Sequence, residues 1–164
     1  MDKKIVQAFF GQGKGKTSAA VGQCIRAASL GNSTIIIQFL KGTDAEEFSF
    51  LSKLEPDIKL FRFDRFEENY CNLTMEQKEE EKQNVLNGFN FARKVIETGE
   101  CDVLVLDEVL GLVDLGIIEI QDIINLINLK DDYIRLVLTG YNMPEKLIPY
   151  VDILSEIRLI KDNT

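Results

Sequence analysis

The chain has 164 residues, of which 45% are hydrophobic and 28% are charged, with a formal net charge of -8 and a pI near 4.7. This length and apolar share suit one globular domain over residues 1–164. A nucleic-acid partner is disfavoured, because the negative charge repels a phosphate backbone over most of the surface. The sequence has no signal-peptide pattern and no apolar run long enough for a bilayer, so we expect a cytoplasmic protein with no membrane partner.

Three cysteines, Cys24, Cys71 and Cys101, lie far apart in a sequence that contains no histidine. A zinc site needs closely spaced cysteine or histidine ligands, and this pattern provides none. We therefore expect three reduced thiols, as is typical of a cytosolic protein.

Apolar runs of strand length alternate with helical stretches along the chain, which is typical of a mostly parallel sheet covered by helices on both faces. The run at residues 34–39 shows little polar alternation, and it therefore predicts a central strand that is buried on both faces. In the first half of the chain we expect strands at residues 4–10, 34–39 and 58–63, and helices at residues 16–30 and 46–54.

A charged, aromatic loop at residues 64–72 precedes a long predicted helix. Thr74 and Gln77 have the spacing of a capping box, which predicts that this helix begins there, and Gly99 marks its end. Because residues 76–82 are almost wholly charged, we expect them to form a solvated helix face. The remaining expected elements are strands at residues 101–107 and 133–139, a helix at residues 119–129, a last helix from Met143-Pro144, and an edge strand at residues 154–160.

A glycine-rich segment at residues 11–18 lies between the first predicted strand and a helix rich in small residues, which is the place of a phosphate-binding P-loop. In such a loop, backbone N–H groups and the helix dipole hold an anion, Lys16 places a cation on the outer phosphates, and Thr17 offers a hydroxyl ligand to Mg²⁺. Only three residues separate Gly11 from Gly15, so this loop is one residue shorter than the general pattern. The predicted nucleotide-binding residues of the loop are Gly11, Gln12, Gly13, Lys14, Gly15, Lys16, Thr17 and Ser18.

An acidic pair follows four apolar residues at the end of the strand predicted at residues 101–107. A P-loop needs a carboxylate at the end of a neighbouring strand to hold its metal ion, and we assign this role to Asp107. For Glu108 three roles stay open: holding a metal-bound water, acting as a base, or capping the next helix. The sequence thus predicts a metal site of Thr17, Asp107 and Glu108 in an α/β, single-domain, three-layer fold like that of P-loop NTPases.

Five segments, taken in order, resemble one family, the P-loop ATP:corrinoid adenosyltransferases. The more specific two are the short loop at residues 11–17 and the segment Gln38-Phe39-Leu40-Lys41-Gly42, and the others are residues 106–108, 138–140 and 155–158. The resemblance implies transfer of the 5′-deoxyadenosyl group of ATP to the cobalt of a reduced corrinoid, with release of triphosphate, in adenosylcobalamin biosynthesis or salvage. It also implies Mg²⁺, a homodimer and a separate reductant such as a flavoprotein.

The resemblance further suggests roles for single residues. Reduced cobalt is itself a strong nucleophile, so the protein has to position the substrates and stabilise the departing triphosphate, with Lys16 and Glu108 as candidate catalytic residues. In this family the triphosphate lies reversed in the loop, and an aromatic loop shields the lower face of the corrinoid. Phe66 is the nearest counterpart of that aromatic residue, with Phe63 and Tyr70 in reserve. Lys41 and Gly42 are assigned to the nucleotide or corrinoid side.

The chain departs from the family pattern at three points. It contains no tryptophan, whereas the aromatic loop of the family carries one. Tyr141 stands where the family has arginine, and Lys161-Asp162 is followed by only two more residues where the family continues with Lys-His and a longer tail. These departures bear on corrinoid binding more than on ATP binding.

Two other functions fit the same motifs. A small-molecule kinase also needs a P-loop and an acidic partner, and a non-catalytic protein that binds ATP or a corrinoid would retain them as well. The released product distinguishes these hypotheses, because adenosyl transfer yields intact triphosphate, a kinase yields ADP, and a binding protein yields neither.

Overall fold

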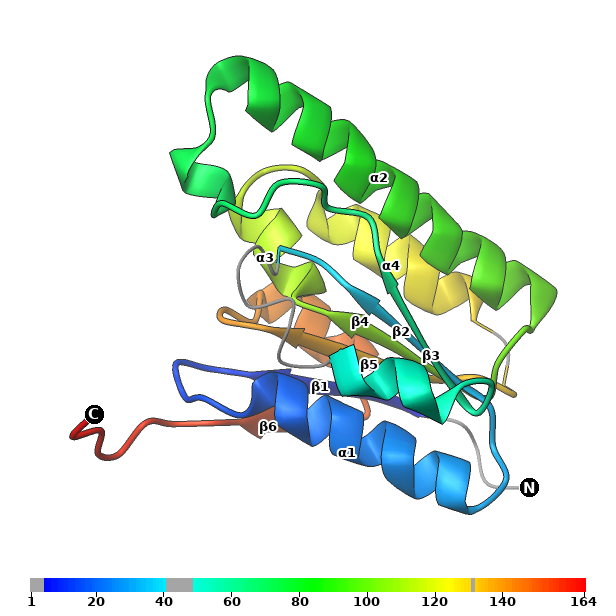
Figure 1. Cartoon of the computed structure of the whole chain (residues 1–164). Coiled ribbons are helices and arrows are strands. Elements are labelled where there is room, and N and C mark those ends of the chain that lie inside the picture. The colour runs from blue at the N-terminus through cyan, green and yellow to red at the C-terminus, as the bar shows by residue number, and fades with distance from the viewer. Residues whose placement is uncertain (1–4, 41–48, 131) are drawn as a thin grey trace.

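The computed structural model describes residues 5–40, 49–130 and 132–164. In this part of the chain six strands form one sheet in the order β3-β2-β4-β5-β1-β6, and every neighbouring pair is parallel. The strands are β1 (Val6–Phe10), β2 (Thr34–Gln38), β3 (Ile58–Arg62), β4 (Val103–Asp107), β5 (Arg135–Gly140) and β6 (Ile153–Glu156). The expected α/β fold is confirmed, with helices on both faces of the sheet (Figure 1).

The helices form the two outer layers (Figure 1). They are α1 (Lys16–Ser29), α2 (Met75–Thr98), α3 (Val109–Asp114) and α4 (Ile120–Leu129), with 3-10 helices η2 (Tyr70–Asn72) and η3 (Glu145–Tyr150). Alternate residues of β4 divide between the two apolar clusters of the protein. Leu104 and Leu106 belong to the cluster that includes α2, α3 and α4, whereas Val105 belongs to the cluster that includes α1. Because both faces of this strand are covered, its sequence is apolar without interruption.

The capping box predicted at the start of α2 is confirmed. The Thr74 hydroxyl accepts a hydrogen bond from the Gln77 N–H at 3.2 Å, and the Thr74 N–H donates to the Gln77 side chain at 3.0 Å. Gly99 follows the helix with φ 64°, a left-handed conformation that glycine adopts without a steric cost. The expected solvated face of residues 76–82 is wrong at one position, because Glu81 is only 3% exposed.

The structure corrects three other expectations. The last predicted helix is a 3-10 helix, and extended Pro144 (ψ 130°) precedes it instead of lying in its first turn. The final edge strand is shorter than predicted, because pairing with β1 stops at Glu156. Of the helix expected at residues 46–54, residues 49–54 are described and are 3-10 helical. None of the helices in the described residues has the length and hydropathy needed to cross a membrane.

Candidate active site

The carboxyl ends of the parallel strands carry the predicted site residues. The P-loop, here residues 11–18, follows β1, Asp107 ends β4, and Thr139 lies near the end of β5. Gln38, at the end of β2, is paired in register with Asp107. Ligands of open parallel sheets bind outside these strand ends, so the topology assembles residues from four strands into one site.

Two glycines of the P-loop allow close approach of another segment of backbone. Gly11 has φ 121°, and a Cβ atom there would overlap the carbonyl oxygen of Ile157. At Gly13 a Cβ atom would overlap both the side chain and the carbonyl group of Ile157. These positions therefore need glycine because the segment after β6 crosses directly against the loop.

The same segment fixes the loop by hydrogen bonds. The Gly13 N–H donates to the Ile157 carbonyl at 2.9 Å, and the Ile157 N–H donates to the Phe10 carbonyl at 2.8 Å. The Gly11 N–H donates to the Tyr141 carbonyl at 3.0 Å. The backbone N–H groups of both glycines thus bond to carbonyl groups of the protein. Gly11 and Gly13 therefore contribute to anion binding through the shape that they give the loop.

Lys16 lies across the P-loop. Its Nζ donates to the carbonyls of Gly11 at 2.8 Å and Gly13 at 3.0 Å, and it lies 5.9 Å from the centre of the Tyr141 ring. Gly15, with φ 108°, directly precedes this lysine at the amino end of α1. The ammonium group is therefore held at the mouth of the loop, next to the positive end of a helix dipole.

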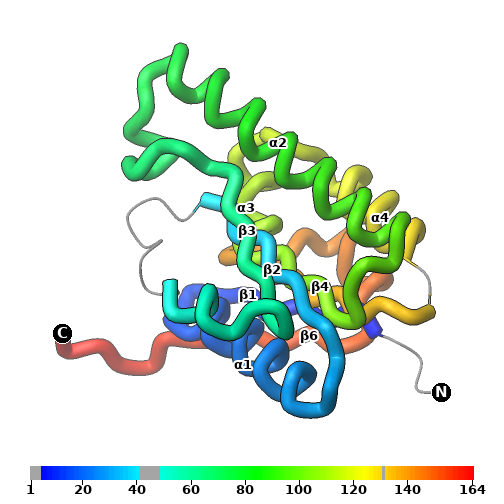
Figure 2. Tube along the Cα trace, turned by 45° about the vertical axis from the view of Figure 1, so that its right-hand side comes forward, coloured from blue at the N-terminus to red at the C-terminus, as the bar shows by residue number. Residues whose placement is uncertain are grey.

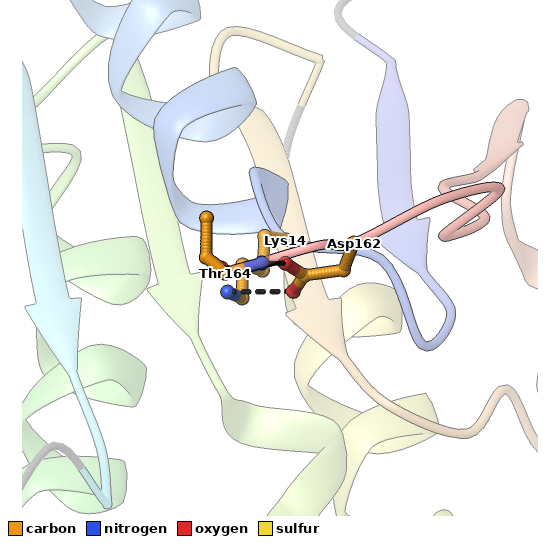
Figure 3. A network of polar contacts seen from close by, with 3 residues as sticks. All are labelled: Lys14, Asp162 and Thr164. Carbon is orange, nitrogen blue, oxygen red and sulfur yellow. Dashed lines mark hydrogen bonds and ion pairs between the residues drawn. The ribbon is translucent and has the colours of Figure 1, made fainter.

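Lys14 differs from Lys16, because it is largely exposed and pairs with Asp162 at 3.0 Å (Figure 3). The C-terminal segment runs beside the P-loop to make this contact (Figure 2). Hydrogen bonds from the Thr164 hydroxyl and N–H, and then the Lys14 contact, lower the pKa of Asp162 to about 2. Asp162 is therefore ionised at neutral pH and available to pair with the lysine.

Asp107 is fully buried and lies at the centre of a polar network. Both of its carboxylate oxygens lie 3.0 Å from the Thr17 hydroxyl, and the Thr139 hydroxyl donates to it at 2.6 Å. The Gln38 amide nitrogen is 3.3 Å away, and the Gln38 oxygen accepts a hydrogen bond from Arg62 at 2.9 Å. The structure thus brings together two of the predicted metal-site residues, Thr17 and Asp107, whose hard oxygen atoms suit Mg²⁺.

Glu108 is half-buried and adopts a left-handed conformation with φ 63°. Its N–H donates to the Thr139 hydroxyl at 2.8 Å, so Thr139 links Glu108 to Asp107. Glu108 stands at the N-cap position of α3, but its side chain makes no capping hydrogen bond. A non-glycine residue held in this conformation is typical of functional sites, and the capping role loses support.

Phe66 lies in the aromatic loop, which we define as residues 64–72 between β3 and α2. Its half-buried side chain contributes to a small hollow at the ends of β2 and β3, lined by Leu40, Asp64, Phe66, Glu68, Asn69, Tyr70 and Glu81. Phe63, one of the reserve candidates, packs against Phe91 with ring centroids 5.5 Å apart, which indicates a core role. Lys41 and Gly42 lie outside the described residues.

The two buried cysteines, Cys24 and Cys101, offer no activated thiol to this site. Burial raises the pKa of both Cys24 and Cys101 to about 12. Cys71 is exposed, and all three are free thiols. A buried thiol with a raised pKa stays protonated and inert, so neither Cys24 nor Cys101 serves as a nucleophile.

Comparison with known proteins identifies the family of the chain. The family model described as "ATP:corrinoid adenosyltransferase BtuR/CobO/CobP" matches residues 2–164. The chain belongs to this family. It is 26% identical over 162 residues to corrinoid adenosyltransferase CobA of Salmonella typhimurium, covering 98% of this chain and 79% of that protein. The corrinoid adenosyltransferase of Escherichia coli K12 is 25% identical, with the same coverage.

Two further similarities concern length and fold. An uncharacterized protein of Nostoc, all2391, is 26% identical over 169 residues, but the chain spans only 43% of its length. The KaiC-like protein PH0186 of Pyrococcus horikoshii matches 85% of this chain and 63% of its own, with a TM-score of 0.51 and 14% identity. That structure supports the P-loop NTPase-like fold alone.

Several site residues could not be found from the sequence. Thr139 and Gln38 lie in segments that the family resemblance marked, but nothing local indicated that both would donate to Asp107. Nothing in the sequence indicated a special role for Ile157 or Glu81, because an apolar residue after a strand and a glutamate in a charged helix are both common. Their contacts join residues that are far apart in the chain.

Proposed function

We propose that the protein transfers the 5′-deoxyadenosyl group of ATP to the cobalt of a reduced corrinoid. A cobalt–carbon bond forms with the electron pair of cob(I), the C5′–oxygen bond of ATP breaks, and triphosphate leaves with that bond's electrons. The observation that supports this most is the assembled Lys16, Thr17 and Asp107 site behind a shortened P-loop, in a chain that the family model matches over residues 2–164.

The nucleotide side stabilises the leaving group. Triphosphate gains negative charge as the C5′–oxygen bond breaks, and a cation held at the loop mouth lowers the energy of that state. On binding, Lys16 exchanges its two carbonyl partners for phosphate oxygens, which are stronger acceptors because they are charged. Lys14 adds a second cation from the exposed side of the loop.

The predicted metal ion suits the same place. Thr17 and Asp107 would hold Mg²⁺, which when bound neutralises charge on the phosphates. Among the described residues no group of three or more acidic, cysteine or histidine side chains forms a metal cluster. Glu108, next to this pair, would hold a water bound to that ion.

The corrinoid side lies at the ends of β2 and β3. Phe66 contributes an aromatic ring to the hollow there, and Lys41 with Gly42 follow Leu40, which lines the same hollow. An aromatic side chain that displaces the lower axial ligand of cobalt makes reduction of cob(II) easier and keeps water out. We assign this role to Phe66, in a cytoplasmic homodimer that receives electrons from a flavoprotein reductant.

The test is adenosylation in solution. The purified protein is incubated with ATP, Mg²⁺ and chemically reduced cobalamin, and the absorbance change of adenosyl-cobalt formation is followed. We expect a rise that depends on both ATP and protein. ATP turnover to ADP with a phosphorylated small molecule would instead indicate a kinase, and tight nucleotide or corrinoid binding without turnover would indicate a binding protein.

A further inference from the structure

A buried carboxylate holds the aromatic loop. Glu81 lies in the second turn of α2 and is 3% exposed, although the two glutamates directly before it, Glu79 and Glu80, are exposed. An ionised side chain is costly to bury unless hydrogen bonds replace its water. The partners of Glu81 therefore indicate what this burial accomplishes.

The partners belong to the loop itself. One carboxylate oxygen of Glu81 accepts from the Phe66 N–H at 2.8 Å, and the other accepts from the Arg65 N–H at 3.0 Å. The Asn84 side chain, one turn further along α2, donates to the second oxygen at 3.3 Å. Two consecutive backbone N–H groups are thus held by the two oxygens of one carboxylate.

This arrangement fixes orientation as well as position. Bonding at two successive peptide groups restricts the φ and ψ torsions of Arg65 that lie between them, and it holds the Phe66 Cα atom close to α2. Glu81 and Phe66 also line the same small hollow, together with Leu40 from the end of β2. The aromatic ring is therefore placed by a rigid helix and not by the loop sequence alone.

We propose that Glu81 is a positioning residue that holds Phe66 toward the corrinoid. This inference rests on the proposed adenosyltransferase function, and it adds a residue outside the P-loop and its metal site. Both carboxylate oxygens of Glu81 accept hydrogen bonds from the backbone of the aromatic loop. Its effect on the reaction passes through the backbone of Arg65 and Phe66.

The test compares Glu81→Gln with Glu80→Gln, an exposed neighbour on the same helix. Glutamine keeps the shape of the side chain but replaces one acceptor oxygen with a donor that faces an N–H group. Hydrogen exchange of the peptide covering residues 64–70 should become faster in Glu81→Gln and stay unchanged in Glu80→Gln. ATP affinity, measured by calorimetry, should match the parent in both variants.

The activity assay separates positioning from general damage. We expect Glu81→Gln to slow adenosylation from cob(II) and a reductant by about tenfold, which is the size expected for the loss of one hydrogen bond to a charged group. Adenosylation of pre-formed cob(I) should slow much less. In a Phe66→Ala background the same substitution should add no further loss. Asn84→Ala, which removes the weakest partner, should shift exchange and rate in the same direction by a smaller amount.

Two results would overturn the proposal. Unchanged exchange in Glu81→Gln would mean that the carboxylate does not hold the loop, and faster exchange with an unchanged cob(II) rate would mean that it holds the loop without serving the reaction. Failure of the proposed function is distinguishable, because the parent protein would then form no adenosyl-cobalt while the exchange comparison would still give a result.

Discussion

The P-loop and the aromatic loop differ in how the fold holds them. The P-loop is joined to the sheet on both sides, through Ile157 after β6 and Tyr141 after β5, and its residues occupy eight consecutive positions. The aromatic loop lies beyond the edge strand β3 and is anchored by one carboxylate from α2 (Figure 1). The P-loop is therefore held by segments that follow two strands of the sheet, whereas the aromatic loop is held from α2, by the hydrogen bonds of Glu81 and by Lys78, which lies 5.8 Å from the centre of the Tyr70 ring.

The largest effect is expected at Lys16. Lys16→Ala should weaken ATP binding by about 100-fold or more, because the triphosphate loses its cation at the mouth of the loop. Calorimetric titration with ATP and Mg²⁺ measures this. Lys14→Ala is the comparison, and it should cost much less because Lys14 is exposed. An unchanged ATP affinity in Lys16→Ala would contradict the assignment of the P-loop.

The close contact between the P-loop and Ile157 is tested at Gly13. Gly13→Ala should destabilise the protein by about 1–3 kcal/mol, because the new methyl group overlaps Ile157. Gly22→Ala is the matched control in α1, where no atom lies within 4 Å of the added carbon. That variant should gain up to about 1 kcal/mol from helix propensity. Denaturant unfolding without nucleotide measures both, and equal stabilities would show that Ile157 does not constrain the loop.

Substitutions at the predicted metal site should have smaller effects on ATP binding. Asp107→Asn should raise the Mg²⁺ concentration needed for half-maximal ATP binding by about tenfold, because it removes a charged oxygen ligand while leaving the P-loop intact. Thr17→Val should act in the same direction. Asp132→Asn, at an exposed position, serves as the control. If the Mg²⁺ titrations of all three variants coincide with the parent, the metal lies elsewhere.

On the corrinoid side, Phe66→Ala should leave ATP affinity unchanged. It should slow adenosylation from cob(II) with a reductant by about tenfold, and adenosylation of pre-formed cob(I) much less, since the aromatic ring assists the reduction. Phe50→Ala, which changes an exposed aromatic residue outside the aromatic loop, should change neither rate. Equal losses in the two assays would assign Phe66 to packing alone.

The smallest effect is expected at Asp162, which pairs with Lys14 at the surface of the P-loop. Asp162 should titrate near pH 2 by carbon NMR, and its pKa should rise toward the ordinary value in Thr164→Val, because the Thr164 hydroxyl is the largest cause of the shift. Since the pKa is lowered, the contact with Lys14 is complete above the ordinary value and is lost only as the pH falls toward 2. A titration unchanged by Thr164→Val would mean that the hydroxyl does not hold Asp162.

The P-loop and the aromatic loop also differ in how far the sequence predicts their contacts. The strands and the P-loop are specified by neighbouring residues, so β4, α1 and the Thr74 cap match their predictions within two residues at each end. The anchor at Glu81 joins residues 15 and 16 positions apart in the chain, and Ile157 reaches the P-loop from the far end of the sequence. Charge and periodicity report a residue's own element, but they do not report which distant backbone it will meet.

The most direct test of adenosyl transfer is the stoichiometry of the two products. The protein is incubated with ATP, Mg²⁺ and cob(I)alamin, and adenosylcobalamin and triphosphate are quantified by chromatography at several times. Adenosyl transfer predicts equal amounts of the two at every time point, and neither product in Lys16→Ala. Formation of ADP without a cobalt–carbon bond would contradict it.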